Sequence, residues 1–246
     1  MSVLTLLLAG PLQSWGASAR FTRRTTEAAP TKSGVLGILA AAQGIQRGDD
    51  TRLTELAALR FGVRIDQPGT RVRDFQTAHH RITDKSMPLS ERFYLADAVF
   101  TAALEGEHTL LTTLRNALRN PVYPPFLGRR SCPPARPVEL AVHDNASLDQ
   151  ALAEEPWHAA DWYQKLHRAT PTVPLVVLRD ASPGDHQGDT LRDHPVSYAA
   201  EHRRHALRTV VSETIDVPNP RAHARPPARQ QPVPRHDPFG PLEDTP

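Results

Sequence analysis

The chain has 246 residues, of which 39% are hydrophobic, and its formal net charge is only +2. This length suits one large domain or two small ones, and the small net charge excludes a protein that coats nucleic acid as a bulk polycation. The single cysteine, Cys132, excludes an internal disulfide and a cysteine-based zinc site, and it fits a reducing, cytoplasmic environment.

Residues 3–8 form a nearly unbroken apolar run that ends before Gly10-Pro11, which predicts a central buried strand. The run is too short for a signal peptide, and no window of the chain has the length of a membrane span, so we expect no membrane partner. A helix capped by Thr31 or Ser33 is predicted next, because apolar residues recur there at helical spacing. These residues are Val35, Ile38, Leu39, Ala42 and Ile45.

Alternating apolar residues predict a strand at 60–66, which the turn 67–69 would join to a returning strand at 71–77 in a hairpin. Residues 78–90 are predicted as an excursion from the sheet, and residues 94–104 as one long strand. Leucines at 110, 111, 114 and 118 predict a second amphipathic helix, which ends before Pro121. This element order is typical of the ferredoxin-like split βαβ fold, whose sheet leaves one face open to a ligand.

After Pro121 the periodicity weakens, and we predict short strands at 137–143, 173–179 and 206–217 and a helical piece near 147–154. From Pro218 onward nine of twenty-nine residues are proline, with arginines spaced among them. Such a segment buries too little apolar area to offset its ordering entropy, so we predict disorder for residues 218–246. The predicted fold class is α+β: a ferredoxin-like (RRM-like) domain at 1–120, a small β-rich part with an arginine-rich loop at 121–217, and the tail.

Two short runs place rigid turn residues beside an aromatic ring and hydrogen-bond donors. The first is Ala-Gly-Pro-Leu-Gln-Ser-Trp-Gly at residues 9–16, where Trp15 offers a flat face for a base; a tryptophan that caps the core is the equally good alternative. The second is Tyr-Pro-Pro-Phe-Leu-Gly-Arg-Arg-Ser-Cys-Pro at residues 123–133. Its prolines restrain a loop that presents Arg129 and Arg130, although a core-closing loop with solvated arginines fits the same pattern.

Positive residues gather locally in the chain, in three clusters that contain few acids. Local basic patches on a near-neutral chain favour a specific anionic partner over general coating, with an ordinary solvated surface as the alternative. The helix start at residues 30–34 would also offer free N–H groups and Lys32 to a phosphate, although its spacing is not that of a Walker motif. The clusters are Arg20, Arg23, Arg24 and Lys32; Arg129, Arg130 and Arg136; and Arg203, Arg204 and Arg208.

Catalysis has weaker support in the sequence. The pair His202 and His205 has a spacing that a metal could use, but its one acidic neighbour is Glu201. A metal-independent ribonuclease needs a base near a 2′-hydroxyl, and His79 or His80 with Tyr123 or Lys32 could serve, yet no spacing requires it. We therefore expect no catalytic residue, no metal and no cofactor.

The two runs, with residues 30–37, 44–47, 61–64 and 73–77, make the chain resemble the CasD family of small, non-catalytic subunits of the type I-E CRISPR Cascade surveillance complex, in the repeat-associated mysterious protein superfamily. The match covers about residues 3–140, and residues 197–203 fit only loosely. The resemblance implies a ferredoxin-like domain with a protruding thumb at about 78–90. It also implies binding of the crRNA 5′ handle, with the helical backbone subunit and the large subunit as neighbours and target DNA as an indirect partner.

Related subunits of another CRISPR subtype cut precursor RNA, so an endoribonuclease of the same fold is one alternative, and a protein-only scaffold is another. For the RNA-holding subunit we expect the aromatic side chains to stack on bases and the cations to pair with phosphates. The predicted contacts are Gln13, Trp15, Arg20, Arg23, Lys32, Tyr123, Arg129 and Arg130.

Overall fold

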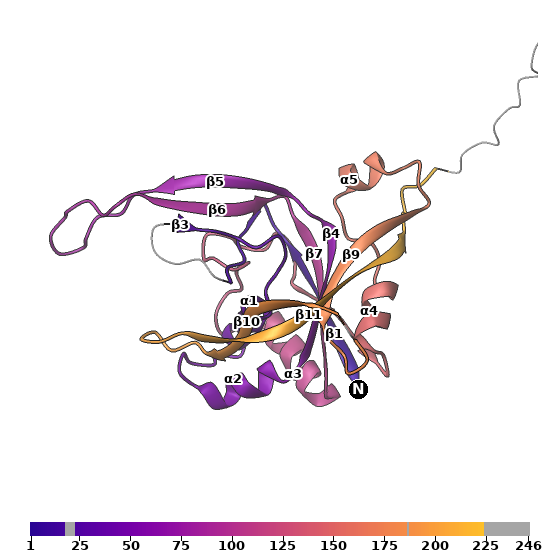
Figure 1. The fold of residues 1–246 in the computed structure, drawn as a ribbon, viewed down its shortest axis with the longest axis horizontal. Helices are drawn as coiled ribbons and strands as arrows, with labels where there is room; N and C mark the ends of the chain where they lie inside the picture. Colours follow the sequence, from indigo (N-terminus) through magenta and orange to yellow (C-terminus); the bar gives the residue numbers. More distant parts are fainter. Residues whose placement is uncertain (18–22, 186, 224–246) are drawn as a thin grey trace, which may run out of the picture.

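The fold is built on two β-sheets, and most of the helices pack on the larger one (Figure 1). The computed structural model describes residues 1–17, 23–185 and 187–223. The larger sheet has seven antiparallel strands in the order β10-β11-β9-β4-β7-β1-β8. The smaller sheet joins β2, β3, β5 and β6.

The centre of the larger sheet has the βαββαβ order that the sequence predicts. Strand β1 (Ser2–Ala9) is followed by α1 (Lys32–Ala42), β4 (Arg60–Gln67), β7 (Val99–Gly106), α3 (His108–Arg119) and β8 (Glu139–Asp144). All eight residues of β1 are buried, as expected of a central strand between two covered faces. The predicted strands at 3–8, 60–66 and 137–143 and both predicted helices are confirmed.

Three further strands extend the same sheet beyond β4. These are β9 (Thr172–Asp180), β10 (Asp189–Ser197) and β11 (Arg204–Pro218). The predicted strands at 173–179 and 206–217 are confirmed, whereas β10 was not predicted. Because β8 pairs with β1 and β9 pairs with β4, the predicted parts 1–120 and 121–217 contribute to one continuous sheet.

Three short helices complete the larger layer: α2 (Asp50–Ala57), α4 (Leu148–Glu154) and α5 (Asp161–Leu166). Helix α4 confirms the predicted helical piece at 147–154, and α2 and α5 were not predicted. Helix α4 begins with a capping box between Ser147 and Gln150, which is the kind of local signal that fixes a helix start. No helix in the described ranges is long and apolar enough to cross a membrane.

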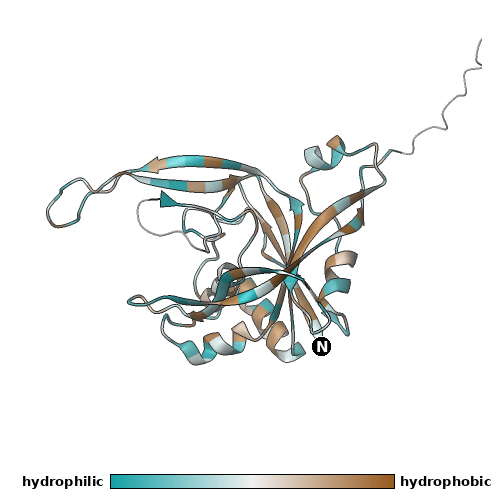
Figure 2. Ribbon diagram, in the orientation of Figure 1, coloured by the Kyte–Doolittle hydropathy of each residue, from teal (hydrophilic) through white to brown (hydrophobic). Residues whose placement is uncertain are grey.

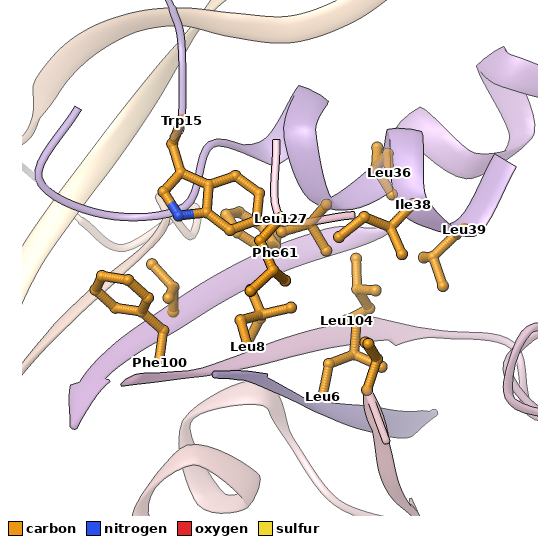
Figure 3. Close-up of a cluster of buried hydrophobic side chains, with 14 of the residues drawn as sticks. Leu6, Leu8, Trp15, Leu36, Ile38, Leu39, Phe61, Phe100, Leu104 and Leu127 are labelled. Atoms are coloured by element: carbon orange, nitrogen blue, oxygen red, sulfur yellow. The ribbon is translucent and has the colours of Figure 1, made fainter. Parts of the chain in front are cut away.

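Side chains on the two faces of the larger sheet bury different helices. Leu4, Leu6 and Leu8 point to the main core, where α1 and α3 pack. Figure 3 shows two of them, Leu6 and Leu8, in this cluster. Val3 points to the opposite face and joins a smaller cluster with Leu148 and Leu152 of α4. The brown stripes along the central strands in Figure 2 follow this arrangement.

The smaller sheet carries a long two-stranded ribbon that projects from the molecule (Figure 1). Strand β5 (Thr70–Gln76) pairs with β6 (Ser90–Ala96) along its whole length, from Thr70 opposite Ala96 to Gln76 opposite Ser90. We call residues 70–96 the ribbon. On the other side of β6, β2 (Leu12–Gln13) pairs at the base of the ribbon, and β3 (Arg23–Arg24) pairs farther out, with Glu91 and Arg92. The predicted excursion at 78–90 is the outer part of this ribbon.

The predicted hairpin of residues 60–66 with residues 71–77 is wrong, and so is the single strand at 94–104. Strand β4 pairs with β7 and β9, while β5 pairs with β6. The reason lies at two corners. At the first corner, before β5, Gly69 has φ +71, and a Cβ there would lie 2.6 Å from the carbonyl oxygen of Ala96. At the second corner, after β6, Asp97 has φ 55. These left-handed residues let the chain leave the larger sheet after β4 and return to it at β7.

The predicted disorder of residues 218–246 concerns mostly residues 224–246, which lie outside the described residues. Pro218 ends β11, and Asn219 is buried. The Asn219 amide Nδ2 donates to the carbonyl oxygens of Gln164 in α5 and of His167 and Thr170 just after it, at 3.0–3.4 Å. The start of the predicted tail, residues 218–223, is therefore part of the fold.

Candidate nucleic-acid interface

The two runs that the sequence singles out lie against each other. The Ser14 N–H donates to the Leu127 carbonyl at 3.1 Å, and the Leu127 N–H donates to the Cys132 carbonyl at 2.7 Å. Leu127 and Cys132 are fully buried, so the proline-rich loop is anchored from inside. Burial raises the pKa of the Cys132 thiol, which fits an anchoring side chain and not a reactive thiolate.

Gln13 and Trp15 are buried completely, and the prediction that they contact RNA is wrong for their side chains. The Gln13 amide donates to the carbonyls of Leu8 and Ala98 at 2.9 and 2.7 Å, and it accepts from the Trp15 indole N–H at 3.1 Å. Trp15 packs beside Leu127 and Leu8 in the core (Figure 3). The alternative interpretation, a tryptophan that caps the core, is the correct one.

Lys32 is also buried, and the predicted phosphate seat at the start of α1 already holds a carboxylate. The Lys32 N–H donates to Asp193 Oδ2 at 2.7 Å, which is where a phosphate oxygen would have to sit. The Lys32 ammonium pairs with Asp180 at 2.9 Å, and its side chain is 5% exposed. This segment therefore binds the chain's own β9 and β10, and the prediction of a phosphate contact by Lys32 is wrong.

Arg208, which the sequence groups with Arg203 and Arg204, completes this buried ion network. Its guanidinium bonds Asp193 at 2.6 and 3.0 Å and Asp180 at 2.7 Å. These bonds to the two carboxylates raise the pKa of Arg208 despite the opposing effect of burial. The network leaves Arg203 and Arg204, but not Arg208, at the surface.

Arg129, Arg130 and Tyr123 line a large groove, which agrees with the sequence-based assignment of these three residues to one surface. The groove has a volume of about 1460 Å³ and lies between the proline-rich loop, α1 and the segment after β10. Tyr123 is 48% exposed, and Arg130 is exposed. Arg129 is held more firmly, because its guanidinium lies 4.8 Å from the Tyr94 ring centre and donates to the Arg24 carbonyl at 2.9 Å.

The lining of the groove carries a strong excess of positive charge. Among the described lining residues one is acidic, Asp49, and six are arginines. Two guanidinium N–H groups in this wall, Arg92 Nε and Arg129 Nη1, are buried without a hydrogen-bond partner among the described residues. Such groups favour an anionic ligand, because a buried donor without an acceptor is costly. The six arginines are Arg24, Arg47, Arg92, Arg129, Arg130 and Arg203.

Four of these arginines were missing from the predicted contacts. Arg24 and Arg203 belong to basic clusters that the sequence shows, so a signal for them existed. Arg92 had none, because its place in the groove depends on the pairing of β6 with β3, where Arg92 lies opposite Arg24. Arg47 follows α1 in the short connection to α2, and its place depends on how that connection packs.

Arg23 is exposed but does not line the groove, and Arg20 lies outside the described residues. The Arg23 side chain is 72% exposed and lies on β3, near Glu91 and the Phe93 ring. The structure thus separates Arg23 from Arg129 and Arg130, although all three were among the predicted contacts.

The histidines proposed for catalysis do not meet Tyr123. His79 and His80 lie in the outer part of the ribbon, where His79 is near Asp84 and His80 accepts from Thr83. The groove does contain His205, whose pKa is lowered by burial and by Arg203. Tyr198 lies beside it, with its pKa raised by burial, and its hydroxyl donates to the Ser33 carbonyl at 2.5 Å. Within the described ranges no cluster of three or more His, Cys, Asp or Glu side chains has metal-binding geometry.

Comparison with known proteins finds one matching family and several relatives. The family model described as CRISPR-associated protein (Cas_Cas5) matches residues 3–211. A curated protein of Escherichia coli (strain K12), CRISPR system Cascade subunit CasD, is 32% identical over 213 residues, which cover 79% of this chain and 89% of the relative.

Two solved structures are similar in both sequence and fold. A crystal structure of a Cas protein is 37% identical with a TM-score of 0.66, and the match covers 92% of this chain and 100% of that one. A chain of a CRISPR RNA-guided surveillance complex is 29% identical with a TM-score of 0.72, and the match covers 92% of this chain and 95% of that one. The groove and the ribbon both lie within the segment that the family model matches.

Proposed function

This chain belongs to the Cas5 family of CRISPR-associated proteins, and from that premise we propose that it is a CasD-type subunit of a type I-E Cascade complex that holds the 5′ handle of the guide crRNA in the arginine groove. The handle is a short unpaired RNA segment, so its phosphates and base faces are open to protein contact. In this role the chain takes part in antiviral defence in the cytoplasm, as one part of a ribonucleoprotein complex.

The observation that carries the proposal is the composition of the groove wall. Six arginines face one aspartate there, although the whole chain has a net charge of only +2. Arginine pairs with phosphate through two parallel N–H bonds and also stacks on bases. Tyr123 and Phe126 add aromatic rings to the same wall. Guanidinium groups beside exposed rings are the usual composition of a site for single-stranded nucleic acid.

The neighbours that follow from this role are the helical backbone subunit and the large subunit of the complex. The ribbon is the segment that extends farthest from the rest of the described fold (Figure 1). We propose that it is the thumb that reaches the adjacent backbone subunit. Target DNA would then be an indirect partner, met through the guide RNA and the large subunit.

We further propose that the subunit is not catalytic. Cleavage of RNA without a metal needs a base that can take the 2′-hydroxyl proton. His205 is the histidine of the groove, and its neutral ring could accept a proton, which is the observation that favours the endoribonuclease alternative. Its neighbour Tyr198, however, uses its proton to bond the Ser33 carbonyl. Incubation of the protein with a repeat RNA in chelator tests this, because cleavage at a unique position would support the nuclease.

The RNA-holding role is tested by the double variant Arg129→Ala/Arg130→Ala. Affinity for a synthetic handle RNA is measured by fluorescence anisotropy over a series of salt concentrations. We expect the affinity to fall by about tenfold or more, and the slope of log affinity against log salt to decrease by about 1 for each lost phosphate contact. A protein-only scaffold would show no specific, salt-dependent affinity.

A matched control removes the same charge elsewhere. Arg168 and Arg192 are exposed and do not line the groove. The variant Arg168→Ala/Arg192→Ala should keep both the affinity and the salt slope of the wild type. Thermal unfolding of both variants verifies that the fold survives. If the folded groove variant binds the handle RNA as well as the control does, the groove is not the RNA site.

A further inference from the structure

Helix α5 carries two large apolar side chains that are open to solvent. Trp162 and Leu166 lie four positions apart, so they share one side of the helix, and they are 51% and 70% exposed. The other side of α5 packs inward, because Tyr163 joins the buried cluster that contains Trp157 and Val173, where β9 begins and β11 ends (Figure 1). We call Trp162 and Leu166 together the α5 face.

The Trp162 ring is held in place although it is exposed. Its edge contact with Tyr163 has a distance of 5.5 Å between ring centres, and Tyr163 in turn lies 6.0 Å from the buried Trp157 ring. Within the described ranges no acceptor bonds the Trp162 indole N–H. A fixed ring with a free N–H is well suited to a proline-rich segment, because the ring packs on proline and the N–H donates to a backbone carbonyl.

The last described residues of the chain run beside this helix. The Arg221 guanidinium pairs with Asp161, the first residue of α5, at 2.5 Å. The His223 N–H donates to the Arg168 carbonyl, just after the helix, at 3.0 Å. Because Asn219 is bonded to α5 and the turn after it as well, the end of the described chain is fixed next to α5.

The sequence that follows is rich in proline and long enough to reach the α5 face. Residues 225–235 read Arg-Pro-Pro-Ala-Arg-Gln-Gln-Pro-Val-Pro-Arg. Pro226 comes three residues after His223, which allows a span of about 10 Å. Trp162 comes six residues before Arg168, a rise of about 9 Å at helical spacing. The first prolines of the segment therefore lie within reach of the Trp162 ring.

We propose that the α5 face is a docking site for the proline-rich segment of this chain, residues 225–235, and that Pro226 and Pro227 pack on it. Proline favours the extended polyproline II conformation, so such a segment loses little entropy when it docks. The short tether gives an effective concentration of about 1 mM or more, so that even a weak contact is occupied within one molecule. The family model matches residues 3–211, so the segment lies outside that match, and the docking does not depend on the groove.

The three tryptophans of the chain make this docking measurable in the full-length protein. Trp15 and Trp157 are 0% and 3% exposed, so acrylamide quenching of tryptophan fluorescence reports mainly on Trp162. The variant Pro226→Ser/Pro227→Ser should raise the quenching constant about twofold and shift the emission to longer wavelength, because serine lacks the ring and the fixed φ of proline and the docked population falls. The variant Trp162→Phe verifies the assignment, since it should remove most of the quenchable emission.

A matched control is available farther along the same tail. The variant Pro238→Ser/Pro241→Ser also replaces two prolines, but both lie outside the docking segment. Its quenching constant and its emission wavelength should equal those of the wild type.

A second measurement identifies what covers the α5 face. Lys165 is exposed and lies next to Leu166, so the pair Lys165→Cys/Ala228→Cys should form a disulfide within one chain, which requires Cα atoms within about 7 Å of each other. The single native cysteine, Cys132, is buried and does not compete. The control pair Lys85→Cys/Ala228→Cys also replaces an exposed lysine, but this one lies in the outer part of the ribbon, far from α5 (Figure 1), and it should not crosslink.

Three results would overturn the proposal. One is that Pro226→Ser/Pro227→Ser is quenched no more than the wild type, which includes the case in which the α5 face is open in this chain and meets another protein instead. The second is that the Lys165→Cys/Ala228→Cys disulfide joins two chains on a gel without reductant, because the occupant would then be a second copy. The third is that either control behaves like its test variant, because the tail would then contact the surface without preference for α5.

Discussion

The contact between Gly128 and the Ser14 carbonyl fixes the distance between the proline-rich loop and the loop after β1. Gly128 has φ +84, and a Cβ there would lie 1.8 Å from Ser14 O. The chain tolerates this approach only because glycine has no side chain. The position of Arg129 and Arg130 in the groove therefore depends on the residue that precedes them.

Replacing Gly128 should open this contact. We expect Gly128→Ala to lower the free energy of unfolding by about 2 kcal/mol or more, because it combines a left-handed backbone with a steric clash. Two controls separate these effects: Gly48 has φ +97 with open space around its Cβ position, and Gly16 has open space and no positive φ. In urea unfolding Gly48→Ala should lose about 1 kcal/mol and Gly16→Ala very little. Equal losses in all three variants would contradict this account.

At the residue scale, the sequence predicts which chemical groups the site contains better than it predicts which of those side chains are exposed. Arg129, Arg130 and Tyr123 follow prolines in a polar segment, and these signals place a loop at the surface. Trp15 and Gln13 carry the same kinds of chemical groups, but their direction depends on which side of the loop faces the core. Glutamine can bond its own backbone as well as a ligand, so the residue type does not distinguish the two roles.

At the scale of elements, α1 is held by charges from two strands that are distant in sequence. Asp193 of β10 accepts from the Lys32 N–H at 2.7 Å and from Arg208, and Asp193 is fully buried. Asp180 of β9 bonds Lys32, Arg208 and the Phe61 N–H. This network joins α1 to β9, β10 and β11, so the wall of the groove formed by α1 moves only if the network breaks.

Neutralising Asp193 should therefore destabilise the protein strongly. We expect Asp193→Asn to lower the free energy of unfolding by about 3 kcal/mol, because it leaves the buried Arg208 without a full counter-charge. The control is Asp161→Asn, which removes the carboxylate of two exposed ion pairs, one with Lys165 at i,i+4 and one with Arg221, and should cost less than about 1 kcal/mol. Urea unfolding measures both. Comparable losses in the two variants would show that the network is only a set of weak surface pairs.

Elements with strong local signals were predicted well, and pairing between distant elements was not. The strands β1 and β4 and the helices α1 and α3 have clear apolar periods, so their existence follows from the sequence. The partner of β5 does not, because residues 67–69 read as a simple turn, whereas Gly69 in fact makes a corner into another sheet. The groove combines β6 with the proline-rich loop, α1 and the segment after β10, and this is why its full set of arginines escaped prediction.

At the scale of the whole molecule, the charge of the chain is distributed unevenly. The groove gathers six arginines against one aspartate, while the net charge of all 246 residues is +2. A strand drawn to such a surface is guided to one place, because the charged residues outside the groove carry no net positive charge and are screened over about 10 Å at ordinary salt. This arrangement suits a subunit that must bind one defined segment of RNA.

The charges of the groove also predict how the affinity for RNA depends on pH. Arginine stays protonated throughout the accessible range, so among the described lining residues the charge can change near neutrality only at His205. Burial first, and then Arg203, lowers the pKa of His205 below its ordinary value of 6.5, so the ring is neutral at pH 7 and gains a proton only on further acidification. At constant salt we therefore expect the affinity for handle RNA, measured by anisotropy, to stay constant from about pH 8 down to about pH 6.5 and to increase only below that.

The variant His205→Gln gives the control for this prediction, since it cannot titrate. Its affinity should match that of the wild type above about pH 6.5, and it should lack the increase below it. The stability of the free protein should change in the opposite sense, because a histidine whose pKa is lowered in the folded state favours unfolding once the unfolded chain takes up a proton. A rise in wild-type affinity as the pH falls from 8 to 7, absent from His205→Gln, would contradict this account. It would place the pKa of His205 above its ordinary value of 6.5 and not below it.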